Sequence, residues 1–218
     1  MELNSKVVAF LGDSITEGVG ASCLDNAYWR VFERLTGSKC FGFGISGTRI
    51  APNKIPSPIE SFDRHFSSRI EELPQNADVI IVFGGTNDFG HGDAPFGQLC
   101  DTIETTFCGA YHGLMQKLIN KFPDAQIVVM TPLHRSSENE LGFNEWGVRR
   151  DHTLEDYVDA IISIAGFYGI PVLDLFRTSG IQPCIPVIQE KYMPDGLHPS
   201  DAGHAKIAKR LAGFLQAL

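Results

Sequence analysis

The sequence predicts an α/β protein: a three-layer α/β/α sandwich around a five-stranded parallel sheet of the flavodoxin-like type. Two observations lead to this prediction. Five short runs are nearly continuous in apolar residues, as in strands buried on both faces of a parallel sheet, at residues 7–11, 39–43, 79–83, 127–130 and 171–175. Helical patterns alternate with these runs, so the connections are expected to be right-handed crossovers.

Three helices are predicted from apolar residues that recur every three or four positions. The first covers residues 99–118 and ends before a Pro-Asp pair. The second covers residues 154–165, with Thr153 as its N-cap. The last begins after Ser200, its expected N-cap, and buries Ile207, Leu211 and Leu215.

Two stretches fit neither a helix nor a strand. Residues 51–61 contain Pro52, Pro56 and Pro58, and each proline lacks a donor and restricts the residue before it. We expect a loop there. Residues 133–152 form a second long connection, whose length is typical of an active-site lid and equally of a plain surface loop.

The composition indicates one globular domain over residues 1–218, with 43% hydrophobic and 20% charged residues. The formal charge of −8 gives no broad basic surface for nucleic acid or anionic lipid. Five scattered cysteines without a C-x-x-C pair predict reduced, mostly buried thiols. The first apolar run is too short for a signal peptide, and residues 160–173 are too short to span a bilayer, so we expect a cytoplasmic protein.

A serine and an Asp-His pair lie near the two ends of the chain. Ser14 follows the first strand, where it is a candidate nucleophile or, alternatively, a helix cap. Asp195 and His198 are three apart, a spacing that lets the carboxylate orient the imidazole; a plain turn is the alternative. A metal site using Asp195, His198 and His204 is a weaker alternative, because no further ligand cluster is present.

Two glycine-containing turns lie between them. Asn87, after the third strand, could offer its side-chain N–H to an oxyanion or stabilise its own turn. Residues 42–47 match the dinucleotide fingerprint G-x-G-x-x-G. That fingerprint needs a helix at the third glycine, and prolines follow Gly47 instead. We therefore expect the Gly47 backbone N–H to approach a substrate, and no cofactor is expected.

Taken together and in this order, Gly-Asp-Ser, Gly-Ile-Ser-Gly-Thr, Gly-Thr-Asn-Asp and Asp-Gly-Leu-His-Pro resemble the SGNH, or GDSL-type, hydrolase superfamily. The resemblance spans residues 12–199 and departs at Gly42, where many relatives carry asparagine. It implies Ser14 as nucleophile, His198 as base, Asp195 as its orienting partner, and an oxyanion hole formed by the N–H groups of Ser14, Gly47 and Asn87.

The expected function is a serine esterase that removes a small acyl group, such as acetyl, from a carbohydrate or similar small alcohol. The alternatives are an acyltransferase, a lysophospholipase-type acylhydrolase and a non-catalytic carbohydrate-binding protein. Short predicted loops favour acetate and butyrate esters over palmitate esters. The residues assigned as substrate contacts are Asp13, which also braces the nucleophile loop, Phe89, Arg135 and Trp146.

Overall fold

The computed structural model describes residues 1–143, 147 and 149–218. Its centre is a parallel sheet of five strands in the order β2-β1-β3-β4-β7. This is the flavodoxin-like order, with its topological switch point between β1 and β3. The strands are β1 (Val7–Gly12), β2 (Lys39–Gly44), β3 (Val79–Phe83), β4 (Gln126–Met130) and β7 (Val172–Leu173).

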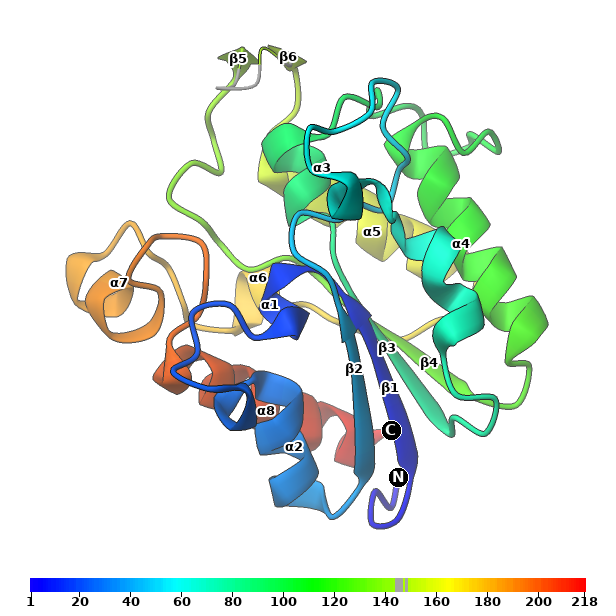
Figure 1. Ribbon diagram of the computed structural model, residues 1–218, viewed down its shortest axis with the longest axis vertical. Coiled ribbons are helices and arrows are strands. Elements are labelled where there is room, and N and C mark those ends of the chain that lie inside the picture. Colours follow the sequence, from blue (N-terminus) through cyan, green and yellow to red (C-terminus); the bar gives the residue numbers. More distant parts are fainter. Residues whose placement is uncertain (144–146, 148) are drawn as a thin grey trace.

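Alternate side chains of the strands enter two separate cores. Leu11 and Val82 belong to the core under α3 (Thr86–His91), α4 (Phe107–Lys121) and α5 (Leu154–Phe167). Phe10 and Ile81 belong to the core under α2 (Tyr28–Thr36) and α8 (Asp201–Ala217). Figure 1 shows the two helical layers on opposite faces of the sheet. The predicted α/β/α sandwich is confirmed.

Short elements fill the connections. They are α1 (Ser14–Glu17), η1 (Leu24–Asn26), η2 (Glu60–Asp63), η3 (Phe66–Glu72), α6 (Leu175–Thr178) and α7 (Pro186–Tyr192). The loop predicted over residues 51–61 is confirmed for residues 51–59, but Glu60 and Ser61 already belong to η2. Within the long connection after β4, β5 (Gly142–Phe143) and β6 (Arg149–Arg150) pair as a small separate sheet that projects from the molecule (Figure 1).

Two predicted boundaries are wrong. The first long helix begins at Phe107 rather than at residue 99, because the Thr106 side chain caps it by accepting from the Gly109 N–H. Leu99 and Ile103 lie in the preceding loop with exposed side chains. The last strand has two residues rather than five, because Asp174 caps a new helical turn.

The predicted helix starts at Thr153 and Ser200 are confirmed. Thr153 forms a reciprocal capping box with Asp156, and the Ser200 hydroxyl accepts from the Gly203 N–H. Ile207, Leu211 and Leu215 are all buried, as expected for the last helix.

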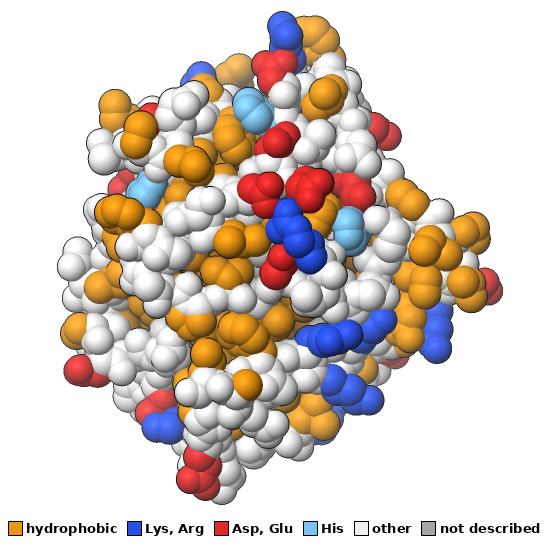
Figure 2. All heavy atoms as spheres, turned by 180° about the vertical axis from the view of Figure 1, so that it is seen from behind, with side chains coloured by type: hydrophobic (Ala, Val, Ile, Leu, Met, Phe, Trp, Pro, Cys, Tyr) orange, Lys and Arg blue, Asp and Glu red, His pale blue; other side chains and the backbone are white. Residues whose placement is uncertain are grey.

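All five cysteines are unpaired thiols. Cys40 and Cys108 are buried, but the expectation that most of the thiols are buried is wrong, since Cys23, Cys100 and Cys184 are exposed. Acidic and basic side chains are interspersed on the face shown in Figure 2. Within the described part of the chain, no helix combines the length and apolar character needed to cross a membrane.

Candidate active site

Ser14 lies at the carboxyl edge of the sheet, at the switch point. Gly12, the last residue of β1, is paired with Gly44 of β2 and Phe83 of β3, so three strands end at one level. Asp13 then turns the chain into α1 by accepting a hydrogen bond from the Ile15 N–H at 3.0 Å. This cap places Ser14 at the first helical position, directly above the sheet.

A chain of hydrogen bonds connects Ser14 with His198 and Asp195. The Ser14 Oγ lies 3.1 Å from His198 Nε2, and His198 Nδ1 lies 2.7 Å from Asp195 Oδ2. Because the Asp195 carboxylate is the natural acceptor for an Nδ1–H, we assign the tautomer in which Nε2 accepts from the Ser14 hydroxyl. This is the arrangement that a serine nucleophile and its base require.

The Asp195 carboxylate is held by its own turn. Its Oδ1 accepts from the backbone N–H groups of Leu197 at 2.9 Å and His198 at 2.6 Å. Partial burial acts to raise the pKa of Asp195, but the hydrogen bonds from the His198 backbone and ring and from Leu197 outweigh it and keep the pKa below its usual value. Asp195 is therefore a carboxylate at neutral pH, able to stabilise an imidazolium.

Gly47 and Asn87 line the same cavity as Ser14 and His198, with a volume of about 270 Å³. Gly47 has φ +71°, and a side chain there would collide with the Phe62 ring, whose nearest atoms lie 2.5 Å from an ideal Cβ. The Asn87 Nδ2 donates to the Thr48 carbonyl at 2.9 Å, and its amide carries a second N–H. The structure thus brings together the five residues assigned to the triad and the oxyanion hole.

Of the predicted substrate contacts, Arg135 lines the cavity and Phe89 does not. Arg135 lines the cavity, with its Nη1 donating to the Thr86 carbonyl at 3.2 Å. Phe89 is 1% exposed, so its assignment as a substrate contact is wrong. It follows Asn87 by two positions and therefore points to the other side of α3, against Tyr157.

Asp13 is also buried, at 2% exposed, and its assignment as a substrate contact is wrong as well. Its carboxyl serves the nucleophile turn as a helix cap, which matches the bracing role expected for it. Burial raises the pKa of Asp13 to about 7. Trp146 lies outside the described residues.

Two buried arginines near the site went unrecognised in the sequence. Arg69 is fully buried and donates to the Gly12 carbonyl at 3.0 Å, the Phe43 carbonyl at 2.6 Å and the Thr48 hydroxyl at 3.1 Å. It therefore joins the ends of β1 and β2 to the turn that carries Gly47. No local pattern around residue 69 marks it, because these partners are distant in sequence.

Arg49 is the second buried arginine. Its guanidinium donates to the Phe62 carbonyl, pairs with Asp63 at 2.9 Å and contacts His91 Nδ1 at 3.0 Å. Burial, together with the charges of Arg49 and Arg135, lowers the pKa of His91 to about 4. The neutral His91 ring is thus an acceptor toward Arg49 on one wall of the cavity.

Two carboxylates hold the chain directly before Gly47 and shortly after it. Glu17, at the end of α1, accepts from the Ser46 N–H at 2.7 Å. Asp88, next to Asn87, accepts from the N–H groups of Ile50 at 3.0 Å and Ala51 at 2.9 Å. Burial raises the pKa of Asp88 to about 6, although these backbone hydrogen bonds oppose the shift. The donor groups are therefore held in place before a substrate binds.

The metal alternative does not fit the geometry. His204 accepts from the Tyr28 N–H at Nδ1 and lies 3.2 Å from the Val19 carbonyl at Nε2, so backbone groups occupy both ring nitrogens. Among residues 1–143, 147 and 149–218, no group of three ligand side chains could hold a metal ion. The dinucleotide fingerprint also lacks its helix, since the first helical turn after Gly47 begins at Glu60.

The arrangement can perform acyl transfer. The Ser14 hydroxyl is hydrogen-bonded to His198, which is hydrogen-bonded in turn to the Asp195 carboxylate. N–H donors line the same cavity, where a tetrahedral oxyanion would form. A reacting carbonyl would enter through the cavity described above.

Comparisons with known proteins agree with this fold. A solved structure of a protein from Lactobacillus plantarum is 33% identical, with a TM-score of 0.82 over 99% of this chain and 98% of that one. A lipase/acylhydrolase from Enterococcus faecalis is 16% identical, with a TM-score of 0.65 over 97% and 96%. An acetyl xylan esterase is 20% identical, with a TM-score of 0.63 over 96% of this chain and 99% of that one. No curated protein matches the chain.

The model of the GDSL-like lipase/acylhydrolase family matches residues 10–206. These residues include part or all of every strand of the parallel sheet and every residue of the site. The chain belongs to the GDSL-like lipase/acylhydrolase family.

Proposed function

We propose that this esterase hydrolyses esters of small acyl groups, acetyl among them, through an acyl-enzyme on Ser14. The observation that carries the proposal is the continuous chain from Ser14 Oγ through His198 to Asp195, at 3.1 and 2.7 Å. Ser14 and His198 line a cavity that Gly47 and Asn87 also line. Each group has the partner that its role requires.

In the first half of the proposed reaction, His198 Nε2 takes the Ser14 proton as Oγ attacks the ester carbonyl carbon. The carbonyl oxygen becomes an oxyanion, which accepts from the N–H groups of Ser14, Gly47 and Asn87. The carbon–oxygen bond to the alcohol then breaks. His198 gives the proton to the leaving oxygen, and the alcohol departs.

Water reverses these steps in the second half. His198 takes a proton from a water molecule, whose oxygen attacks the acyl carbon. The intermediate collapses, the carboxylic acid leaves, and the proton returns to Ser14 Oγ. Asp195 remains ionised throughout and keeps the Nδ1 proton of His198 in place. The steps use only side chains, backbone N–H groups and water.

Two observations support a small acyl group and a polar alcohol. The cavity at Ser14, of about 270 Å³, is too small to enclose a long acyl chain. Arg135 gives its wall a guanidinium that can donate to the hydroxyl groups of a carbohydrate. By its name, one structural neighbour acts on acetylated xylan, and an acetylated carbohydrate is accordingly the first substrate class to screen.

The direct test is turnover of 4-nitrophenyl acetate by the wild type and by Ser14→Ala. We expect kcat/KM to fall by about 10³-fold or more, with an unchanged melting temperature. An alanine variant with wild-type activity would rule out Ser14 as nucleophile. Acetate and butyrate esters are expected to react faster than palmitate esters, and a strong palmitate preference would refute the small-acyl proposal.

A further inference from the structure

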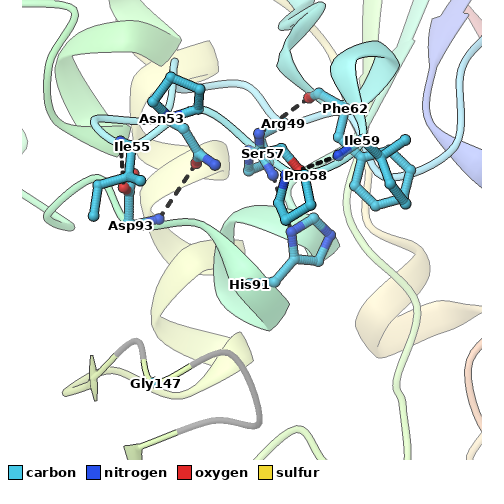
Figure 3. Close-up of a pocket in the computed structure, with 11 residues that line it drawn as sticks. Arg49, Asn53, Ile55, Ser57, Pro58, Ile59, Phe62, His91, Asp93 and Gly147 are labelled. Carbon is cyan, nitrogen blue, oxygen red and sulfur yellow. Dashed lines mark hydrogen bonds between the residues drawn. The ribbon is translucent and has the colours of Figure 1, made fainter.

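A second cavity of about 410 Å³ adjoins the site. It shares Phe62 and His91 with the cavity at Ser14, so the two cavities are neighbours at these residues. Its remaining wall comes mainly from the loop between Arg49 and Phe62, and the main apolar contributors are Ile55, Pro56, Pro58 and Ile59. Figure 3 shows this loop lying over His91, which extends toward it from α3.

The loop is held in shape by carboxylates. Asp93 accepts from the N–H groups of Lys54 at 2.7 Å and Ile55 at 2.8 Å, which ties the first half of the loop to the end of α3. Asp63 accepts from the Ser57 N–H at 2.8 Å and pairs with Arg49. With Pro56 between the anchored residues and Pro58 directly after them, the cavity is formed before a ligand arrives.

The surface that this cavity offers is apolar. Ile55 is 73% exposed and Ile59 is 48% exposed, although both line a cavity where a ligand could cover them. Among the described residues of the lining, the one cationic side chain is Arg49, which is itself buried and is engaged by Asp63, Phe62 and His91. An apolar group would remove the isoleucine side chains from water without meeting an unpaired charge.

The position of the second cavity indicates whether it would hold the acyl side or the alcohol side of an ester. His198 must protonate the leaving oxygen, so the alcohol lies on the side of the site that Val19, Leu197 and His198 form. None of these three residues lines the second cavity, which meets the site at Phe62, beside Gly47. A group in the second cavity is therefore attached to the acyl side of the carbonyl.

We propose that the loop formed by residues 53–62, with His91, is an acyl subsite that takes an apolar acyl chain of about four to eight carbons. This inference rests on the proposed function, because it needs an acyl group on Ser14. It extends the small-acyl range beyond acetyl, since a chain of this length fits within a cavity of about 410 Å³.

The experiment compares two esters that carry the same chain on opposite sides. Ethyl hexanoate has the chain on the acyl side and hexyl acetate has it on the alcohol side; ethyl acetate is the common reference. In the double variant Ile55→Asn with Ile59→Asn, the kcat/KM ratio of ethyl hexanoate to ethyl acetate should fall about tenfold. The ratio of hexyl acetate to ethyl acetate should stay within about twofold.

The matched control is Ile103→Asn, an isoleucine that is 66% exposed in a loop outside this cavity. It should leave both ratios at their wild-type values. An unchanged hexanoate ratio in the double variant, or a fall in the hexyl acetate ratio instead, overturns the acyl subsite while Ser14-dependent turnover of ethyl acetate leaves the proposed function standing. Full activity in Ser14→Ala would overturn both.

Discussion

Single residues in this site are held by hydrogen bonds that exist before any substrate arrives. Asn87 is the clearest case. Its side chain is almost fully buried, and one of its two amide hydrogens is already committed to the Thr48 carbonyl. The side chain therefore cannot rotate freely, and its remaining N–H costs no reorganisation when an oxyanion forms.

We expect Asn87→Ala to lower kcat by about 10²- to 10³-fold, with little change in KM, because the lost donor acts on charge that develops only in the transition state. Steady-state kinetics with 4-nitrophenyl acetate measure both constants. Asn120→Ala, an exposed change on α4, serves as control. A raised KM at unchanged kcat would assign Asn87 to ground-state binding instead.

At the scale of elements, the carboxyl ends of β1 and β2 depend on Arg69. One buried guanidinium serves two strand-end carbonyls, those of Gly12 and Phe43, and the Thr48 hydroxyl in the turn beside Gly47. Burial lowers the pKa of Arg69 to about 10, so it stays charged at neutral pH. The turn that carries Ser14 and the turn that carries Gly47 are thereby joined through a single side chain.

Replacing Arg69 by methionine should lower the free energy of unfolding by about 3 kcal/mol, since buried carbonyls lose a charged donor. It should also lower kcat, because the Gly47 turn loses its anchor. Urea denaturation and steady-state kinetics measure the two effects. Arg210→Met, at an exposed position of α8, should change neither; equal effects in both variants would refute the bracing role.

The order of strands and helices determines which parts of the site can be predicted from the sequence. Ser14 and Asn87 follow apolar strands, and parallel strands bring their ends to one edge, so their proximity is predictable. The role of Arg69 cannot be predicted in this way. Its two strand-end partners, Gly12 and Phe43, lie 57 and 26 residues from it in the sequence, and no local pattern links them. Apolar periodicity extends back to Leu99, but the Thr106 cap begins the helix only at Phe107.

Across the whole molecule, the two cores contain titratable groups whose burial makes stability depend on pH. His204 is 0% exposed and joins α8 to the chain segments at Tyr28 and Val19. Burial lowers the pKa of His204 from 6.5 to about 4. His204 therefore binds a proton more readily in the unfolded chain than in the folded one. The stability that the folded protein gains from a neutral, buried His204 is fully present above pH 6.5 and is lost as the pH falls toward 4.

We expect His204→Asn to be less stable than the wild type at pH 7, by about 1–3 kcal/mol, because two buried backbone groups lose a partner. The difference in free energy of unfolding between the two proteins should narrow by about 1–2 kcal/mol at pH 5. At that pH the wild type loses stability, because His204 is protonated in the unfolded chain but stays neutral in the folded one. Urea denaturation at both pH values measures it. A gap of equal size at pH 5 and pH 7 would contradict the assigned direction.

The central claim is that Ser14 is the nucleophile of this site, and covalent labelling tests it most directly. The wild type is treated with a fluorophosphonate, and the modified peptide is located by mass spectrometry. We expect one label per chain, on Ser14, with no label in Ser14→Ala and much slower labelling in His198→Ala. A label on another residue, or an unlabelled Ser14 in an enzyme that still hydrolyses esters, would contradict it.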